Sequence, residues 1–269
     1  MSQTQNTNGQ LTKLDSLKNM LNAPSVQEQF KNALAENSGP FVASVIDLYN
    51  GDSYLQNCEP KQVVMECLKA AVLKLPINKN LGFAWIVPYK SGDKLVPQFQ
   101  IGYKGLIQLA LRTGQYRIIN ADIVYEGEYR SSNKLTGEFD LSGARKSDVV
   151  VGYFAHIELN NGFSKTLYMT KEKIMAHAAR YSKSYKQPNG PWAKDFDPMA
   201  IKTVLRNLLS HYGFLSVDMI NAFDRDEDMD VADTVGKEIR NNANQKETGF
   251  DEIPQAELVP GNESPNPGF

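Results

Sequence analysis

The turn Asn160-Asn161-Gly162 places the strongest constraint on the fold, because it separates two runs of strand-forming residues, 149–159 and 163–169. Asn and Gly adopt the positive φ angles that tight hairpin turns need, so the pattern predicts an antiparallel β-hairpin. A second predicted hairpin joins 83–89 to 95–101 through Ser91-Gly92-Asp93-Lys94. Residues 117–125 read as a further strand, and the polar, Gly-rich stretch 127–147 as a loop or an irregular hairpin.

Helical periodicity lies on both sides of these strands. Ser25 and Glu28 have the spacing of a capping box at a helix start, after one earlier amphipathic helix. The other predicted helices are 41–49, Pro60 to about 74, a helix capped by Thr170 that ends near 181, a helix from Asp197-Pro198 to Gly213, and 216–223. Helices that pack on a small antiparallel sheet place the chain in the α+β class.

The composition and motifs of the sequence exclude several classes of protein. The 269 residues include only two cysteines, Cys58 and Cys67, which excludes a disulfide scaffold and Cys-rich zinc modules. No apolar run is long enough to span a bilayer, and residues 1–10 lack the pattern of a secretory signal. No phosphate-binding G-x-x-x-x-G-K-[ST] motif is present, and the three histidines lack metal-ligand spacing. We therefore expect no cofactor and no membrane partner.

The small net charge of −2 conceals an uneven distribution. Residues 224–269 carry 12 acidic and 4 basic side chains, so the preceding residues have a net charge of +6. A basic body with an acidic tail is common in proteins that handle nucleic acid. An ordinary solvated surface with a disordered tail explains the same numbers. We divide the chain into a flexible segment with a helix that could serve assembly (1–24), a folded basic core (25–225) and a disordered acidic tail (226–269).

One helix presents cations on a single face. Lys104, Gln108 and Arg112 are spaced four residues apart, so they line the side opposite an apolar stripe. Two cations and an amide without an acid can bind phosphates, and the helix N-terminus adds amide donors. A solvated helix face is an equally good explanation of this segment alone.

A denser basic region spans 165–206, where nine basic residues outnumber three acidic ones. Tyr181, Tyr185 and Trp192 are interleaved with these cations, an arrangement that suits single-stranded nucleic acid. Trp192 in Gly190-Pro191-Trp192 could equally anchor a loop in the core. Further along, Lys202 and Arg206 form a polar stripe on the last long helix.

Three blocks of the sequence resemble the RecT family of phage single-strand annealing proteins. They are Leu81-Gly82-Phe83-Ala84-Trp85-Ile86-Val87-Pro88-Tyr89, the stretch from Gln100 to Gly114 with Gly102-Tyr103-Lys104-Gly105, and Gly190-Pro191-Trp192 followed by Met199 to Arg206. The blocks occur in the family's order, and the resemblance covers roughly residues 25–225. The loop before Gly190 departs from it, because its length and content vary among relatives.

The resemblance implies a curved sheet and helices that frame a basic DNA groove. It implies annealing of single-stranded DNA without ATP during homologous recombination, through rings or helical filaments of identical subunits. The implied partners are single-stranded DNA, the annealed duplex intermediate, an exonuclease and the host single-strand-binding protein, in the cytoplasm of a bacterium whose phage or prophage encodes the chain. The candidate DNA contacts are Tyr103, Lys104, Arg112, Arg117, Lys183, Lys186, Trp192, Lys202 and Arg206, with no catalytic or metal-binding residue.

Two other functions remain open from the residues alone. A metal-dependent DNA-processing nuclease would use carboxylates that the sequence does not bring together. A structural oligomer would use its basic face to bind an acidic protein surface. Annealing differs from both because it needs only a held backbone and free bases, with no bond made or broken.

Overall fold

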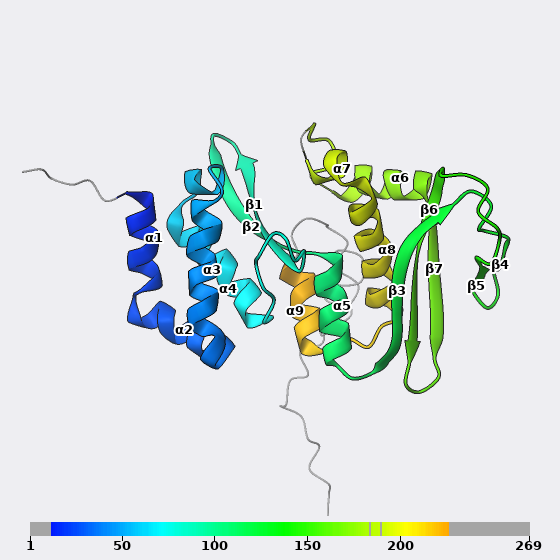
Figure 1. Cartoon of the computed structure of the whole chain (residues 1–269), viewed down its shortest axis with the longest axis horizontal. Coiled ribbons are helices and arrows are strands. Elements are labelled where there is room, and N and C mark those ends of the chain that lie inside the picture. Colours follow the sequence, from blue (N-terminus) through cyan, green and yellow to red (C-terminus); the bar gives the residue numbers. More distant parts are fainter. Residues whose placement is uncertain (1–11, 183, 189, 226–269) are drawn as a thin grey trace, which may run out of the picture. The chain divides into compact units, whose positions relative to one another are not determined.

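The computed structural model describes residues 12–182, 184–188 and 190–225. All of them belong to one compact unit, residues 1–231, while a second unit, 232–269, lies outside the described residues. The predicted acidic tail and Lys183 therefore also lie outside them. Antiparallel pairing and mixed helix and strand confirm the α+β class (Figure 1).

Four helices and two 3₁₀ turns precede the first strand within residues 12–83. They are α1 (Lys13–Leu21), α2 (Pro24–Leu34), η1 (Ala35–Asn37), α3 (Ser38–Asn50), η2 (Leu55–Asn57) and α4 (Pro60–Val72). Helices α1, α2 and α3 pack against α4, and Leu17 and Leu21 of α1 are buried in the core. Assembly through α1 stays a prediction.

The strands in the described part of the chain divide among three antiparallel sheets. The first pairs β1 (Ala84–Ser91) with β2 (Lys94–Ile101), as the sequence predicts. The second has the order β3-β6-β7, from Tyr116–Tyr125, Val150–Leu159 and Ser164–Thr170. The third is a short hairpin of β4 (Ser131–Asn133) and β5 (Glu138–Asp140), within the stretch predicted as irregular.

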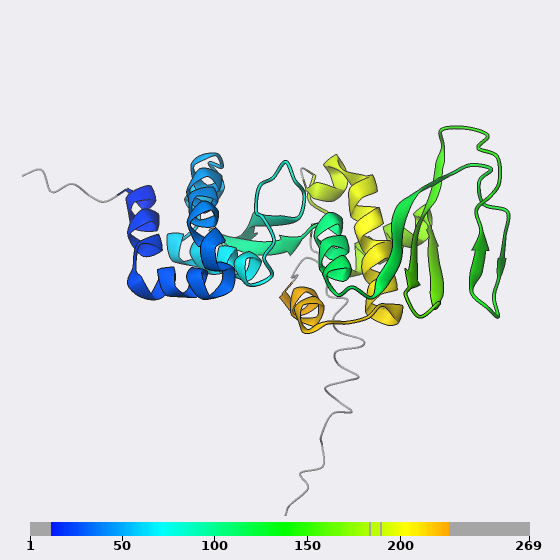
Figure 2. The same ribbon diagram turned by 60° about the horizontal axis from the view of Figure 1, so that its bottom comes forward.

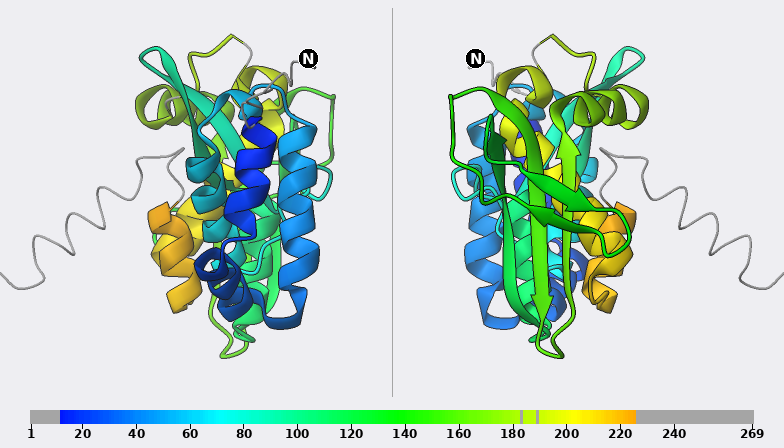
Figure 3. Two further views of the ribbon diagram at one scale, coloured as in Figure 1. Left: turned by 90° about the vertical axis from the view of Figure 1, so that its left-hand side faces the viewer. Right: turned by 90° about the vertical axis from the view of Figure 1, so that its right-hand side faces the viewer.

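Helix α8 (Phe196–Tyr212) packs on all three strands of the β3-β6-β7 sheet, and α5 (Tyr103–Arg112) packs against α8. In the right-hand view of Figure 3, this sheet lies in front of α8. The remaining helices are α6 (Lys171–Tyr181), α7 (Pro191–Lys194) and α9 (Val217–Arg225), the last of which contacts α5 and β2. Every residue from Ala200 to Arg206 is buried, so the polar stripe of this helix does not face solvent.

Two predicted helix starts are wrong. Helix α2 begins at Pro24 after Ala23, and no side chain caps it. Pro at the first position already has a helical φ and lacks the amide that a cap would satisfy, so Ser25 lies inside the helix. Helix α8 begins at Phe196, and the Asp197 carboxylate accepts a 2.6 Å hydrogen bond from the Tyr153 hydroxyl instead of capping. Burial and this hydrogen bond raise the pKa of Tyr153.

Other local signals are confirmed. The Thr170 hydroxyl accepts a hydrogen bond from the Lys173 amide at the start of α6, and α8 ends at Gly213. Helix α4 covers β2, and the Phe99 amide donates to a Glu66 carboxylate oxygen at 2.7 Å. This bond fixes the β1-β2 hairpin on the helical layer.

Candidate nucleic-acid interface

The junction between β2 and α5 is built on two glycines. The Gly102 amide donates to the Phe83 carbonyl at 2.9 Å. A Cβ on Gly102 would lie 2.1 Å from the Gly82 oxygen, and one on Gly105 would lie 2.3 Å from the Phe83 oxygen. Only glycine permits this approach, because any larger residue would force the backbones apart. The Gly102-x-x-Gly105 pattern therefore fixes the first turn of α5 against the start of β1.

A cleft of about 460 Å³ lies beside this junction. Its walls come from the loop before β1, both strands of the first hairpin, the start of α5, and the starts of α7 and α8. Among the predicted DNA contacts it brings together Tyr103, Lys104 and Lys202. These three residues come from two of the sequence blocks, which the fold places on one cleft.

Three lysines give the cleft its charge. Lys104 is exposed at the start of α5, and Lys202 is 4% exposed on α8. Lys79 pairs with Asp52 at 2.6 Å. Burial alone would raise the pKa of Asp52, but hydrogen bonds from Lys79 and from the Leu55 and Tyr54 amides lower it. Asp195 also lines the cleft, which therefore has three cations and one acid among its lining residues.

Aromatic and polar side chains of the first hairpin complete the lining. Trp85 and Gln100 are directly paired across the two strands, so their side chains lie on one face of the hairpin. Val87 follows Trp85 by two residues and shares this face. Trp85 was missing from the sequence prediction, although strand alternation in 84–91 places it opposite the buried Ala84 and Ile86. Helix α5 has no side-chain cap, so its first-turn amides remain available to a ligand.

Arg112 and Arg117 lie outside the cleft lining. The two terminal nitrogens of Arg112 donate to the carbonyl oxygens of Leu73, at 2.7 Å, and Lys74, at 2.8 Å, just after α4. Arg117 on β3 pairs with Glu158 on β6, while 62% of its side chain stays exposed. Both cations already have protein partners, and their contact with DNA stays a prediction.

Trp192 is 3% exposed and has a complete set of partners. Its Nε1 donates to the Ser182 hydroxyl at 3.0 Å. Its ring meets Tyr185 and Phe196 edge to face, at centroid distances of 5.6 and 5.5 Å. This environment favours the core alternative for Trp192. Lys186 lies on the exposed part of the same loop.

Arg206 is 2% exposed on α8. Its guanidinium donates to the Phe223 carbonyl at 2.9 Å and lies 5.1 Å from the centre of that ring. Arg206 thereby joins α8 to α9. The family resemblance assigned it to DNA, and that contact stays a prediction.

The described residues contain neither a candidate metal cluster nor a candidate membrane span. No group of three or more His, Cys, Asp or Glu side chains gathers there to hold a metal ion. No helix within 12–225 has the length and apolar character to cross a membrane.

A protein-family model covers all three sequence blocks. The family model described as "RecT family" matches residues 39–245. The uncharacterized protein YqaK of Bacillus subtilis is 48% identical over 207 residues, which cover 77% of this chain and 70% of that protein. Protein RecT of Escherichia coli is 29% identical over 221 residues, covering 77% of this chain and 78% of that protein. The matched range contains every element of the cleft.

Proposed function

The chain belongs to the RecT family of DNA recombination and strand-annealing proteins, and we propose that it anneals complementary single strands without ATP. The cleft beside α5 holds the backbone of one strand in this proposal. Identical subunits assemble into rings or helical filaments along the DNA. No step makes or breaks a covalent bond.

The observation that carries the proposal is the meeting of Lys104, Lys202 and Tyr103 on one cleft. Lysines bind phosphates as point charges and do not distinguish between bases. They can therefore hold a strand of any sequence. The unsatisfied amides of the α5 start add donors for a phosphate oxygen. Trp85 and Tyr103 offer flat surfaces to the sugar or base beside that phosphate.

Base pairing supplies the driving force for the reaction. Each paired step of a duplex contributes about 1.4 kcal/mol. The protein has to remove secondary structure, hold each backbone and leave the bases free. A cleft that contacts phosphates meets these needs without a nucleotide cofactor.

Annealing of two complementary fluorescent oligonucleotides tests the proposal. The reaction contains no ATP, is run with and without EDTA, and is repeated across a salt series. We expect annealing that survives EDTA and weakens with salt, because phosphate contacts displace counterions. Strand loss that depends on added magnesium or manganese would instead support the nuclease alternative. An absence of DNA binding at low salt would support the protein-binding alternative.

The proposal also covers partners and location. An exonuclease would expose the single strand, and the host single-strand-binding protein would occupy it first. The protein would act in the cytoplasm of a bacterium, from a phage or prophage gene. The acidic residues 226–269 would fend off wrong contacts or recruit one of these partners.

A further inference from the structure

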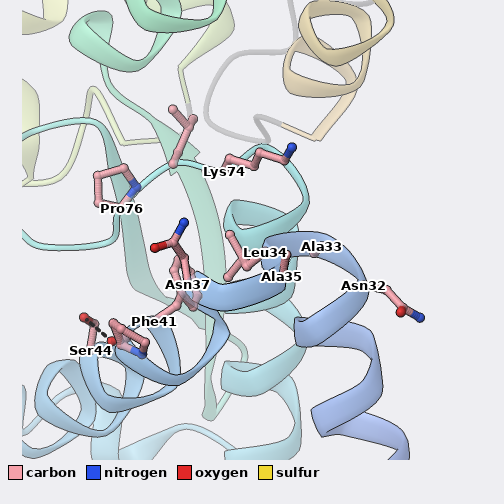
Figure 4. A pocket seen from close by; sticks show the side chains of 11 residues that line it. Asn32, Ala33, Leu34, Ala35, Asn37, Phe41, Ser44, Lys74 and Pro76 are labelled. Atoms are coloured by element: carbon pink, nitrogen blue, oxygen red, sulfur yellow. Dashed lines mark hydrogen bonds between the residues drawn. The ribbon is translucent and has the colours of Figure 1, made fainter.

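A second pocket lies among the first helices, away from the cleft. Its volume is about 590 Å³, and it is formed by the end of α2, η1, the start of α3 and the segment after α4. Figure 4 shows Leu34, Asn37 and Phe41 on the helical side, with Lys74 and Pro76 facing them. The walls are mostly apolar, and the polar groups are the amides of Asn32 and Asn37, the Ser44 hydroxyl and the Lys74 ammonium. Nothing in the proposed function uses this pocket.

Two residues with positive φ line the same pocket. Ala35 has φ 50° and ψ −120°, and Lys74 has φ 52°. They are the two non-glycine residues with positive φ in the described part of the chain. Lys74 is the left-handed residue that ends α4, since the Leu75 amide donates to the Ala70 carbonyl at 3.0 Å and the Lys74 amide to the Ala71 carbonyl at 2.9 Å. The Arg112 guanidinium donates to the Lys74 carbonyl at 2.8 Å, which holds this wall in place.

A projecting apolar side chain is found on the β4-β5 hairpin. Leu135, in the turn of this hairpin, is 94% exposed. The turn is ordered, since the Asn133 side-chain oxygen accepts from the Leu135 amide at 2.9 Å and Lys165 of β7 donates to the Thr136 carbonyl at 3.1 Å. These hydrogen bonds hold the turn in a conformation that leaves the leucine exposed to solvent. A fixed projection loses little conformational entropy when it binds.

The charges beside the projection match those beside the pocket. Leu135 is followed and preceded by exposed charges of opposite sign, Glu138 and Lys134. The pocket also has one acidic and one basic residue beside it. Glu36 lies between two lining residues, and Lys74 lines the opposite wall. A docked hairpin can thus place Lys134 near Glu36 and Glu138 near Lys74.

We propose that Leu135 of one copy of this chain enters the 32–76 pocket of a second copy. Figures 1 and 2 show the β4-β5 hairpin beyond β7 and the pocket helices beyond the β1-β2 hairpin, so one chain does not fill its own pocket. Two different patches make the contact heterologous, which repeats from copy to copy and generates a ring or an open filament. The inference rests on the assembly step of the proposed function and assigns its surfaces.

The contact is small, and this determines where it forms. One hairpin tip buries less than the roughly 1,200 Å² of a stable interface. Copies bound side by side on one strand experience a high effective concentration of each other. Hairpin docking therefore depends on DNA, or on further contacts between the same two copies.

Cysteine cross-linking between two single variants tests the contact. Leu135→Cys and Asn37→Cys proteins are mixed on single-stranded DNA and treated with a short bismaleimide. Native Cys58 and Cys67 are buried, and burial raises the pKa of both thiols, that of Cys58 to about 11, so neither reacts readily. We expect a cross-linked dimer at least fivefold above either variant alone. The control mixture pairs Leu135→Cys with Ser91→Cys, at the exposed turn of the β1-β2 hairpin.

The outcomes separate this inference from the proposed function. Equal cross-linking in both mixtures, or none in the first, overturns the inference if the mixture still anneals DNA. Failure of the unsubstituted protein to anneal overturns the proposed function. The cross-linking result then still decides whether the hairpin docks in the pocket. Asn37 makes no side-chain cap to α3, so its replacement removes no helix contact. Ser44→Cys, on the opposite side of the same pocket, repeats the test at a second position.

A charge exchange sharpens the assignment. Glu36→Lys in the pocket partner should lower the cross-linked yield about twofold to fivefold, as expected for an exposed ion pair. Adding Lys134→Glu to the Leu135→Cys partner should restore it. Loss without restoration, or no loss in Glu36→Lys, would contradict the docking geometry.

Discussion

The guanidinium of Arg206 on α8 donates to the main-chain oxygen of Phe223 on α9 at 2.9 Å, and it lies over the ring of the same residue. A side chain that sequence similarity assigns to DNA thus joins two helices. Because Arg206 is buried, we expect its replacement to lower the free energy of unfolding. Each cation of the predicted interface therefore needs a test that separates stability from DNA binding.

Arg206→Ala should lower the free energy of unfolding by about 2–3 kcal/mol, because a buried hydrogen bond from a charged group is lost. Urea unfolding followed by far-UV circular dichroism measures the change. Lys186→Ala, at an exposed position of the loop, is the control and should leave the midpoint unchanged. Full stability of Arg206→Ala with weakened DNA binding would return Arg206 to the interface.

Arg112→Ala should also act on stability. Its guanidinium joins the carbonyls of Leu73 and Lys74, so removal should cost about 1.5–3 kcal/mol. The dependence of DNA affinity on salt should stay as in the unsubstituted protein. A shallower salt dependence at unchanged unfolding midpoint would show that Arg112 contacts a phosphate instead.

Lys104→Ala should weaken DNA binding in every sequence. The slope of log affinity against log salt should fall by about 0.7, the value for one lost contact on single-stranded nucleic acid. Fluorescence anisotropy of a labelled oligonucleotide at several salt concentrations measures it. The matched variant Arg117→Ala should change the slope less, because Arg117 is already paired with Glu158. Equal effects of both variants would extend the interface onto β3.

Trp192→Ala should destabilise the protein by about 3–5 kcal/mol, as for a large aromatic side chain removed from a core. Trp192→Phe keeps much of the packing against Tyr185 and Phe196 and loses the bond to Ser182, so its cost should be smaller. Thermal unfolding ranks the two. A stable Trp192→Ala protein that no longer binds DNA would favour base stacking.

His177 on α6 should make stability depend on pH. Burial, followed by the nearby Arg206 charge, lowers the pKa of His177 from its usual 6.5. Near pH 6.5 the unfolded chain therefore binds a proton at His177 that the folded chain does not bind. The contribution of neutral His177 to the free energy of unfolding is complete above pH 6.5, and it is lost as the pH falls from there toward the pKa of the folded state. Melting temperatures of the protein and of His177→Gln between pH 5 and 8 check this. Parallel curves would remove His177 as the cause.

Local signals in the sequence determined most of the secondary structure. The Asn160-Asn161-Gly162 turn joins β6 and β7, Thr170 caps α6, and Gly213 ends α8. Turn and cap chemistry act within a few residues, so the chain carries them wherever it folds. The two helix starts that were wrong, near Ser25 and Asp197, were decided by a neighbouring proline and by a tyrosine 44 residues away.

Only the tertiary structure decided which cations face the solvent. Helical spacing places Lys202 and Arg206 on one face of α8, but it does not show whether another element covers that face. The sheet, α5 and α9 pack around α8, so both residues are buried, while Lys104 at the start of α5 stays exposed. The same holds for the pocket and Leu135, because they depend on packing between elements that are distant in the sequence. Periodicity is a property of one element, whereas burial is a property of its neighbours.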